Sequence, residues 1–349
     1  MSVSTKFDIP PGSGQLVSLP VARLYTHNDL SIDVQAVRGK RKGPTLFVSA
    51  AIHGDEINGV EIVRRLLQHP ALKNLRGTLL AIPIVNVHGF LNNSRYLPDG
   101  RDLNRSFPGS AKGSLAGRVA HTFLDEIVRH CSHGIDLHTG ARHRGNLPQI
   151  RADMNNEATR QMAEVFGVPV VLHSRTRDGS LREVAADNDI PVITYEAGEA
   201  LRFDEVAIRA GVKGVINVMR HIGMLPASRR RKAKVPPVLS DESYWLRASE
   251  SGILRALVPV GAKVEAGDTV AMISDPFGSK SVEINASTAG IIIGRTYLPL
   301  VHEGEALFHI AKYKANIDRV YSRVEAFNEQ HEPDTEKYPP SDIDEPPIY

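Results

Sequence analysis

"SAAIHGDEINGVEIV", residues 49–63, joins the end of an apolar run to the start of an amphipathic helical pattern. The apolar run, PTLFVSAAI, is typical of a strand buried on both faces of a sheet. The segment HGDE, residues 53–56, stands between strand and helix. Ligand sites of α/β proteins lie at the carboxyl ends of strands, but acids also favour helix N-termini. The junction is therefore either a polar bend, with Asp55 capping or orienting the helix start, or half of a metal site.

Strand and helix patterns alternate through residues 44–227. The apolar runs are PTLFVSAAI, GTLLAIPIVN, HGIDLH, VPVVLHS and IPVITYEA, and the helical patterns are EINGVEIVRRLLQH, LAGRVAHTFLDEIVRH and NEATRQMAEVFG. This alternation predicts an α/β domain with a largely parallel sheet and helices on both sides. His143 and Arg144, in GARHRGNLPQIRAD at residues 140–153, either line a pocket or belong to a solvated loop.

Composition changes on both sides of this domain. Residues 1–43 predict β segments that pack on the core. Residues 228–239 include SRRRKAKVPPV and predict a linker; a nucleic-acid patch is the alternative, although the run has no interleaved aromatics. Residues 240–312, rich in Val, Ile and Gly with regularly spaced short strands, predict a small all-β barrel or sandwich. Residues 313–349 predict a short helix and an acidic, Pro-rich tail.

The overall composition narrows the function classes. Net charge is +2, from 42 basic and 40 acidic residues, which gives no reason to expect a nucleic-acid or membrane partner. The single cysteine, Cys131, rules out an internal disulfide and a thiolate metal cluster, and it fits a reducing compartment. The start MSVSTKFDIPPGSGQ has no secretory signal pattern, and no apolar stretch approaches the ~18 residues of a membrane span. We therefore expect a cytoplasmic protein.

Polar side chains stand at the ends of three predicted strands. His53 and Glu56 follow the first, Asp136 and His138 lie in GIDLHTG, and Glu196 lies in TYEAGE. Strand ends of one parallel sheet share an edge, so these clusters can converge. A catalytic zinc ion takes three His or carboxylate ligands and keeps a position open for water, and His53, Glu56 and His138 supply such a set. Asp136 is either a turn residue or the acceptor for a ligand histidine's second ring N–H.

A fourth polar cluster lies in the Gly- and Pro-punctuated segment NNSRYLPDGRDLNRSFPG, residues 92–109. Its polar side chains include Arg95, Arg101, Asn104 and Arg105. Guanidinium groups bind carboxylates bidentately, so this loop suits carboxylate recognition as well as a solvated surface. It follows a strand whose end should lie near the first strand end, which favours the binding role. Arg175 and Arg177, in SRTRDGS, could add a second anion subsite.

Taken together, HGDE, RDLNRSFPG, DLHTG and YEAGE resemble, in this order and spacing, the motifs of the succinylglutamate desuccinylase/aspartoacylase family of the zinc carboxypeptidase superfamily. The resemblance covers residues 40–225. It implies a carboxypeptidase-like three-layer α/β/α core with a mostly parallel mixed sheet and one Zn²⁺ per chain, held by His53, Glu56 and His138.

The resemblance also implies roles for the remaining polar residues. Glu196 matches the general base that activates water. Asn104 and Arg105 match the pair that binds the substrate carboxylate. Arg95 resembles the family arginine that steadies the oxyanion. Its spacing to DLNR is longer than in aspartoacylase proper, so Arg101 remains a rival for that role.

The implied activity is a zinc-dependent hydrolase that cleaves the amide bond of a small N-acyl amino acid or related carboxylate-bearing amide. A zinc carboxypeptidase acting on short or modified peptides is the alternative within the same chemistry. A non-catalytic binding or carrier protein is the alternative of another class, because residues 240–312 resemble biotinyl/lipoyl hairpins. Lys280 lies near the modified-lysine position of such domains, but its flanking residues differ, so we interpret it as an ordinary turn lysine. A homo-oligomer is compatible with the sequence.

Overall fold

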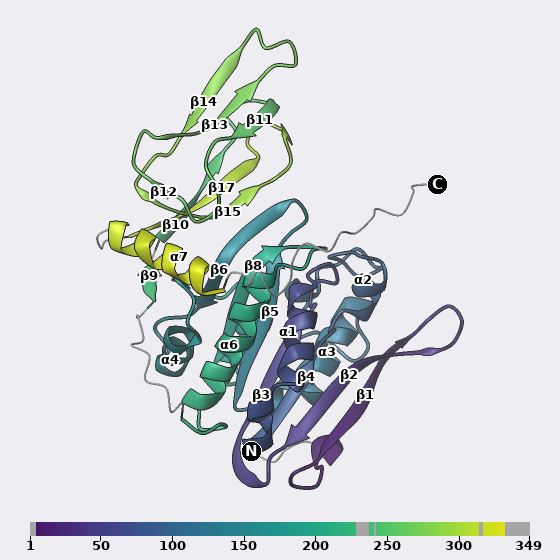
Figure 1. The fold of residues 1–349 in the computed structure, drawn as a ribbon. Coiled ribbons are helices and arrows are strands. Elements are labelled where there is room, and N and C mark those ends of the chain that lie inside the picture. Colours follow the sequence, from purple (N-terminus) through teal and green to yellow (C-terminus); the bar gives the residue numbers. More distant parts are fainter. Residues whose placement is uncertain (1–4, 228–236, 241, 314–316, 332–349) are drawn as a thin grey trace, which may run out of the picture.

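The computed structural model describes residues 5–227, 237–240, 242–313 and 317–331, and a large mixed sheet runs through most of them (Figure 1). In its central part, neighbouring strands are β1 (Gly14–Arg23), β2 (Asp29–Arg38), β4 (Arg76–Ile82), β3 (Arg41–Ala50), β5 (His133–Gly140), β8 (Val192–Glu199) and β6 (Arg144–Ala152). Strands β4, β3, β5 and β8 are parallel, whereas β1, β2 and β6 pair antiparallel. Two short strands, β7 (Val170–His173) and β9 (Val238–Ser240), extend from β6 in parallel.

Helices cover both faces of this sheet because alternate side chains of its strands point to opposite sides. On β3, Leu46 and Val48 pack in one core and Phe47 packs in the other. The first core is covered by α1 (Asn58–Leu67), α4 (Glu157–Phe166) and α6 (Glu205–His221). The second is covered by α3 (Leu115–Glu126) and α5 (Leu181–Ala186). The predicted three-layer α/β/α fold with a mostly parallel mixed sheet is confirmed.

Short helices complete the core. They are the α-helix α2 (Val87–Leu91) and the 3-10 helices η1 (Thr5–Phe7), η2 (Pro70–Asn74), η3 (Leu103–Arg105) and η4 (Val128–His130). Within the described ranges, no helix is long and apolar enough to cross a membrane.

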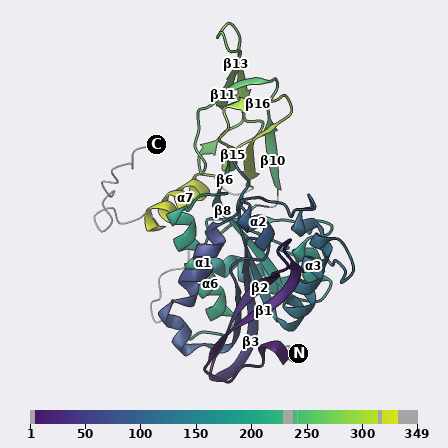
Figure 2. The same ribbon diagram turned by 90° about the vertical axis from the view of Figure 1, so that its right-hand side faces the viewer.

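The C-terminal part is all-β, as predicted, apart from α7 (Ile317–His331). A four-stranded antiparallel sheet contains β14 (Ser281–Asn285), β13 (Thr269–Ser274), β11 (Gly252–Ala256) and β16 (Leu300–Val301). The other strands are β10 (Glu242–Arg247), β12 (Lys263–Val264), β15 (Gly290–Thr296) and β17 (Ala306–Lys312), and they join the large sheet. Figures 1 and 2 show this β region standing on one end of the α/β core, with α7 at its base.

Two stretches test the interpretation of the sequence. In GARHRGNLPQIRAD, for which the sequence allows a pocket wall or a solvated loop, His143 lies in an exposed turn and residues 144–152 form the mostly buried strand β6. Of the predicted linker, residues 228–236 lie outside the described residues, and β9 begins at Val238 and pairs with β7. The predicted acidic tail, from residue 332 onward, also lies outside them. Between core and β region the sheet is continuous, since β15 pairs with β6.

Candidate metal centre and active site

The segment HGDE forms a tight turn between β3 and α1. The Glu56 backbone N–H donates to the His53 carbonyl at 3.1 Å, which brings both side chains to the same side of the turn. Gly54 lies directly against the backbone of Gly89, where an added Cβ would come within 2.0 Å of the carbonyl carbon. Only glycine fits at this position. The chain therefore bends sharply between His53 and Glu56, and the bend brings their side chains together.

Asp55, in the same turn, does not cap the following helix. The N-cap of α1 is Ile57, which makes no side-chain capping bond. Asp55 is buried, its Oδ1 has no hydrogen-bond partner within the described structure, and its Oδ2 lies 3.6 Å from Arg142 Nε. Burial and the nearby Glu56 raise the pKa of Asp55. Of the two roles expected for Asp55, capping or orienting the helix start, capping is therefore wrong, since the turn points its carboxylate inward instead.

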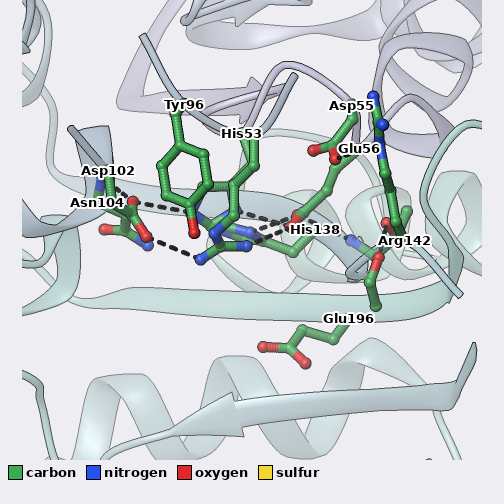
Figure 3. Close-up of polar contacts among 12 residues, drawn as sticks. His53, Asp55, Glu56, Tyr96, Asp102, Asn104, His138, Arg142 and Glu196 are labelled. Carbon is green, nitrogen blue, oxygen red and sulfur yellow. Dashed lines mark hydrogen bonds and ion pairs between the residues drawn. The ribbon is translucent and has the colours of Figure 1, made fainter. Parts of the chain in front are cut away.

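His53, Glu56 and His138 converge at the carboxyl ends of β3 and β5 (Figure 3). His53 Nδ1 lies 2.8 Å from Glu56 Oε1, and His138 Nδ1 lies 2.8 Å from Glu56 Oε2. The Thr139 backbone N–H donates to Glu56 Oε2 at 3.1 Å, which fixes the carboxylate. All three side chains are buried, and their ligand atoms lie within 4.8 Å of one another.

The other ring nitrogen of each histidine faces a second carboxylate. His138 Nε2 lies 2.7 Å from Asp136 Oδ2, the contact suggested for Asp136 by the sequence. His53 Nε2 lies 3.1 Å from Asp102 Oδ1. Sequence reasoning missed Asp102, although it belongs to the quoted motif RDLNRSFPG. These contacts orient each Nδ1 toward the centre of the cluster, as outer carboxylates of metal sites commonly do.

The charges of the cluster fit a bound divalent cation. Burial alone would raise the pKa of Glu56, but His53 and His138 outweigh it and lower that pKa well below its ordinary value. Burial alone would lower the pKa of His138, but Asp136 and Glu56 outweigh it and raise that pKa well above its ordinary value. The surroundings therefore favour positive charge at this point. Two imidazole nitrogens and one carboxylate form a donor set that Zn²⁺ accepts.

Arg95 reaches this cluster and Arg101 does not. Arg95 Nη1 lies 3.2 Å from Glu56 Oε1, and Nη2 donates to Asp102 Oδ2 at 2.9 Å. Arg101 is exposed, is not among the residues lining the cavity, and its Nε lies 3.7 Å from Asp99. The structure thus brings only Arg95 to the candidate metal centre.

Asn104 and Arg105 also line the cavity, within the 3-10 helix η3. The Asp102 side chain accepts a hydrogen bond from the Asn104 backbone N–H at 2.9 Å and thereby starts this helix. Asn104 Oδ1 accepts a hydrogen bond from the Leu181 backbone N–H at 2.9 Å, and the Arg105 guanidinium donates to the Asn104 carbonyl. Both side chains are therefore held by local hydrogen bonds at the cavity wall.

Glu196 lies on β8, in register with His138 of β5. Asn146 Nδ2 donates to its Oε2 at 2.9 Å, and Arg151 Nε lies 3.0 Å from its Oε1, at ion-pair distance but without hydrogen-bond alignment. In Figure 3 the carboxylate stands apart from the His53–Glu56–His138 cluster. Asn146 and Arg151 both come from β6, which the sequence did not predict as a strand.

These residues enclose one cavity of about 230 Å³. Its walls include seven arginines but only two acids, Glu56 and Glu196. The arginines are Arg95, Arg105, Arg144, Arg151, Arg177, Arg182 and Arg295. The β region contributes Arg295 and Trp245, and of the loop pair Arg175 and Arg177 only Arg177 lines the cavity.

The chain is similar in sequence to known proteins. The sequence model of the succinylglutamate desuccinylase/aspartoacylase catalytic domain matches residues 42–222. The chain is 24% identical over 283 residues to the N-alpha-acetyl-L-2,4-diaminobutyric acid deacetylase of Halomonas elongata, which covers 78% of this chain and 83% of that protein.

Solved structures share the fold. The crystal structure of a succinylglutamate desuccinylase/aspartoacylase from Rhodobacter sphaeroides superposes with a TM-score of 0.79 at 22% identity, over 89% of this chain and 99% of the other. The product-bound structure of the ectoine utilization protein EutE (DoeB) from Ruegeria pomeroyi gives a TM-score of 0.78 at 22% identity, over 90% and 98%. Both likenesses extend through the C-terminal β region as well as the core.

Proposed function

The chain belongs to the succinylglutamate desuccinylase/aspartoacylase family. We propose that it is a zinc-dependent hydrolase that removes the acyl group from a small N-acyl amino acid. One observation carries the proposal. The cluster of His53, Glu56 and His138 shares a cavity of about 230 Å³ with Glu196, Asn104 and Arg105. The name of the Halomonas elongata relative, a deacetylase of an N-acetylated amino acid, supports the reaction type.

His53, Glu56 and His138 would hold the zinc ion, with Asp136 and Asp102 fixing the two imidazoles. A zinc ion in this position polarises an acyl carbonyl and lowers the pKa of water. The protein's contribution is to present two Nδ1 atoms and one carboxylate at a single buried point.

Glu196 is the proposed general base. It takes the proton of the attacking water and later delivers it to the nitrogen of the leaving amine. Asn146 and Arg151 hold its two oxygens at 2.9 and 3.0 Å. Arg95, which points at the cluster, is placed to stabilise the negative charge that develops on the carbonyl oxygen. The exposed position of Arg101 supports Arg95 for this role.

Asn104 and Arg105 are the proposed binding site for the substrate carboxylate. Holding that group at one wall fixes the amide relative to Glu196, and such orientation supplies a large part of the rate. The excess of arginine in the cavity favours anionic substrates generally. It disfavours a substrate with a free cationic amine, such as the one named for the Halomonas elongata relative.

The two alternative functions, a carboxypeptidase and a non-catalytic binding or carrier protein, agree less well with the geometry of the site. The volume of the cavity, about 230 Å³, with Trp245 and Arg295 of the β region in its wall, suits a small substrate better than a long peptide. A carrier role would use Lys280, whose ammonium instead pairs with Glu250. A binding protein without catalysis would also have no use for Glu196 in the same cavity as the His53–Glu56–His138 cluster.

The test is amine release from a panel of N-acyl amino acids by the zinc-loaded protein, compared with Glu196→Gln and with Glu164→Gln, an exposed acid on α4. We expect Glu196→Gln to keep its zinc and to lower kcat by about 10²–10⁴-fold, with Glu164→Gln unchanged. Zinc content measured in a His53→Ala/His138→Ala variant should fall to background. Full activity of Glu196→Gln, or unchanged zinc in the double variant, contradicts the assignment.

A further inference from the structure

Glu196 depends on β6 for every polar contact that the described residues give its carboxylate. Asn146 donates to Oε2 at 2.9 Å, and Arg151 lies 3.0 Å from Oε1. The backbone register places Glu196 opposite Gln149, between these two residues. The carboxylate is thus held from both sides by one neighbouring strand.

An irregularity in β6 makes this double contact feasible. Asn146 and Arg151 are five positions apart, so in a regular strand their side chains would point to opposite faces. The pairing of β6 with β8 shifts register between Asn146 and Gln149, the mark of a bulge or similar irregularity. An extra residue in one strand re-aims the side chains beyond it. The irregularity therefore brings the Asn146 amide and the Arg151 guanidinium to the same acid.

The other edge of β6 is held by the C-terminal β region. Strand β15 pairs antiparallel with it through Gly294↔Asn146, Arg295↔Gly145 and Thr296↔Arg144. The Tyr297 backbone N–H also donates to the His143 carbonyl at 2.7 Å. The β region thus supplies the second neighbour of residues 144–146 of β6, the part that carries Asn146, whereas β7 of the core supplies it for residues 149–152.

Gly294, which pairs with Asn146, leaves room for the Asn146 side chain. A Cβ added to Gly294 would lie 2.7 Å from Asn146 Oδ1 and 3.3 Å from the Gly145 carbonyl oxygen. Gly294 is not in the left-handed backbone region, so its requirement is one of space. A larger residue at this position would displace the Asn146 amide, whose nitrogen donates to Glu196.

We infer that Asn146 is a positioning residue for Glu196, and that the C-terminal β region sets its position through the Gly294–Asn146 contact. This rests on the proposed role of Glu196. The β region is then a support for the general base in addition to forming a wall of the cavity. Neither Asn146 nor Gly294 contacts the metal cluster in the described structure, so their effect should reach the reaction through Glu196.

The experiment is a double-mutant cycle on the zinc-loaded protein. Asn146→Ala and Gly294→Ala should each lower kcat about 10- to 150-fold, the range for one lost hydrogen bond to a charged group, while KM and zinc content stay within twofold. In the Glu196→Gln background both changes should have no further effect, because they act through that carboxylate. Asn146→Ser, which keeps a donor on a shorter side chain, should recover part of the loss.

The control is Gly278→Ala, at the exposed β13–β14 turn, which perturbs the β region without contacting β6. Full kcat in Asn146→Ala, or equal losses with and without Glu196, overturns the inference and leaves the deacylase proposal intact. Full activity of Glu196→Gln instead overturns the proposed function. A crystal structure of Gly294→Ala gives a result independent of turnover. An Asn146–Glu196 contact unchanged from 2.9 Å would refute the coupling.

Discussion

Replacing Asp136 tests whether the carboxylates behind the histidines control metal affinity. Asp136 Oδ2 lies 2.7 Å from His138 Nε2, and its Oδ1 accepts a hydrogen bond from Ser49 Oγ at 2.8 Å. The residue is 1% exposed, so water cannot easily substitute for it. Asn can keep both contacts in one amide orientation and remove only the charge, whereas Ala removes both.

Loss of such an outer carboxylate lowers metal affinity by about 10–100-fold, which corresponds to about 1.4–2.7 kcal/mol. We expect Asp136→Asn near the lower value, because the hydrogen bonds survive. Asp136→Ala should lie near the upper value, because His138 also loses the partner that fixes its ring.

The assay is competition for zinc against a chromophoric chelator, with far-ultraviolet circular dichroism to verify the fold. Asp33→Asn is the matched control, since it removes the charge from a Ser–Asp contact of 2.6 Å on the exposed face of β2. A folded Asp136→Ala variant with the wild-type zinc dissociation constant would refute the reasoning. So would an equal loss in Asp33→Asn.

Three further predictions follow from other contacts. Gly54→Ala should lower the free energy of unfolding by about 3 kcal/mol, because its Cβ would lie 2.0 Å from the backbone of Gly89. In the same urea unfolding experiment, the control Gly113→Ala should keep a free energy of unfolding close to that of the wild type. Burial, with Arg151 and Arg177 nearby, lowers the pKa of His309 to about 3. Below pH ~6.5 the unfolded chain therefore binds a proton at this position that the folded chain does not. The free energy of unfolding then falls by up to about 1.4 kcal/mol for each pH unit of acidification. His309→Asn should remove this fall, as measured by urea unfolding. Arg177→Gln should raise KM for substrates with a second carboxylate about 10-fold and leave neutral analogues unaffected, in steady-state kinetics.

The sequence was informative where chain periodicity and residue chemistry agree. His53 stands directly after a long apolar run and His138 near the end of the short run HGIDLH, so the ends of β3 and β5 could be located from the letters alone. Glu196 followed from the same reasoning on β8. Parallel pairing then placed these ends along one edge without any knowledge of strand order.

The supporting residues were harder to predict because their roles depend on long-range pairing. β6 lacks clean alternation, since it contains Pro148 and an irregular register, and it is paired with β8 on one edge and with β15 and β7 on the other. Asp102 resembles an ordinary turn acid until the loop folds over His53. No local pattern distinguishes such residues from solvated ones.

Because the large sheet is continuous, the C-terminal β region is structurally part of the α/β core. Leu147 of β6 shares a hydrophobic core with Ile291 and Ile293 of β15 and with Val320 and Val324 of α7. That core has members on both sides of the predicted domain boundary, so the β region is not simply appended to a finished catalytic domain. Without it, residues 144–146 of β6 would have unpaired backbone groups on one edge, whereas residues 149–152 would stay paired with β7. The part of the strand that carries Asn146 would then lose its second neighbour, which ties the chemistry of the core to residues far away in the sequence.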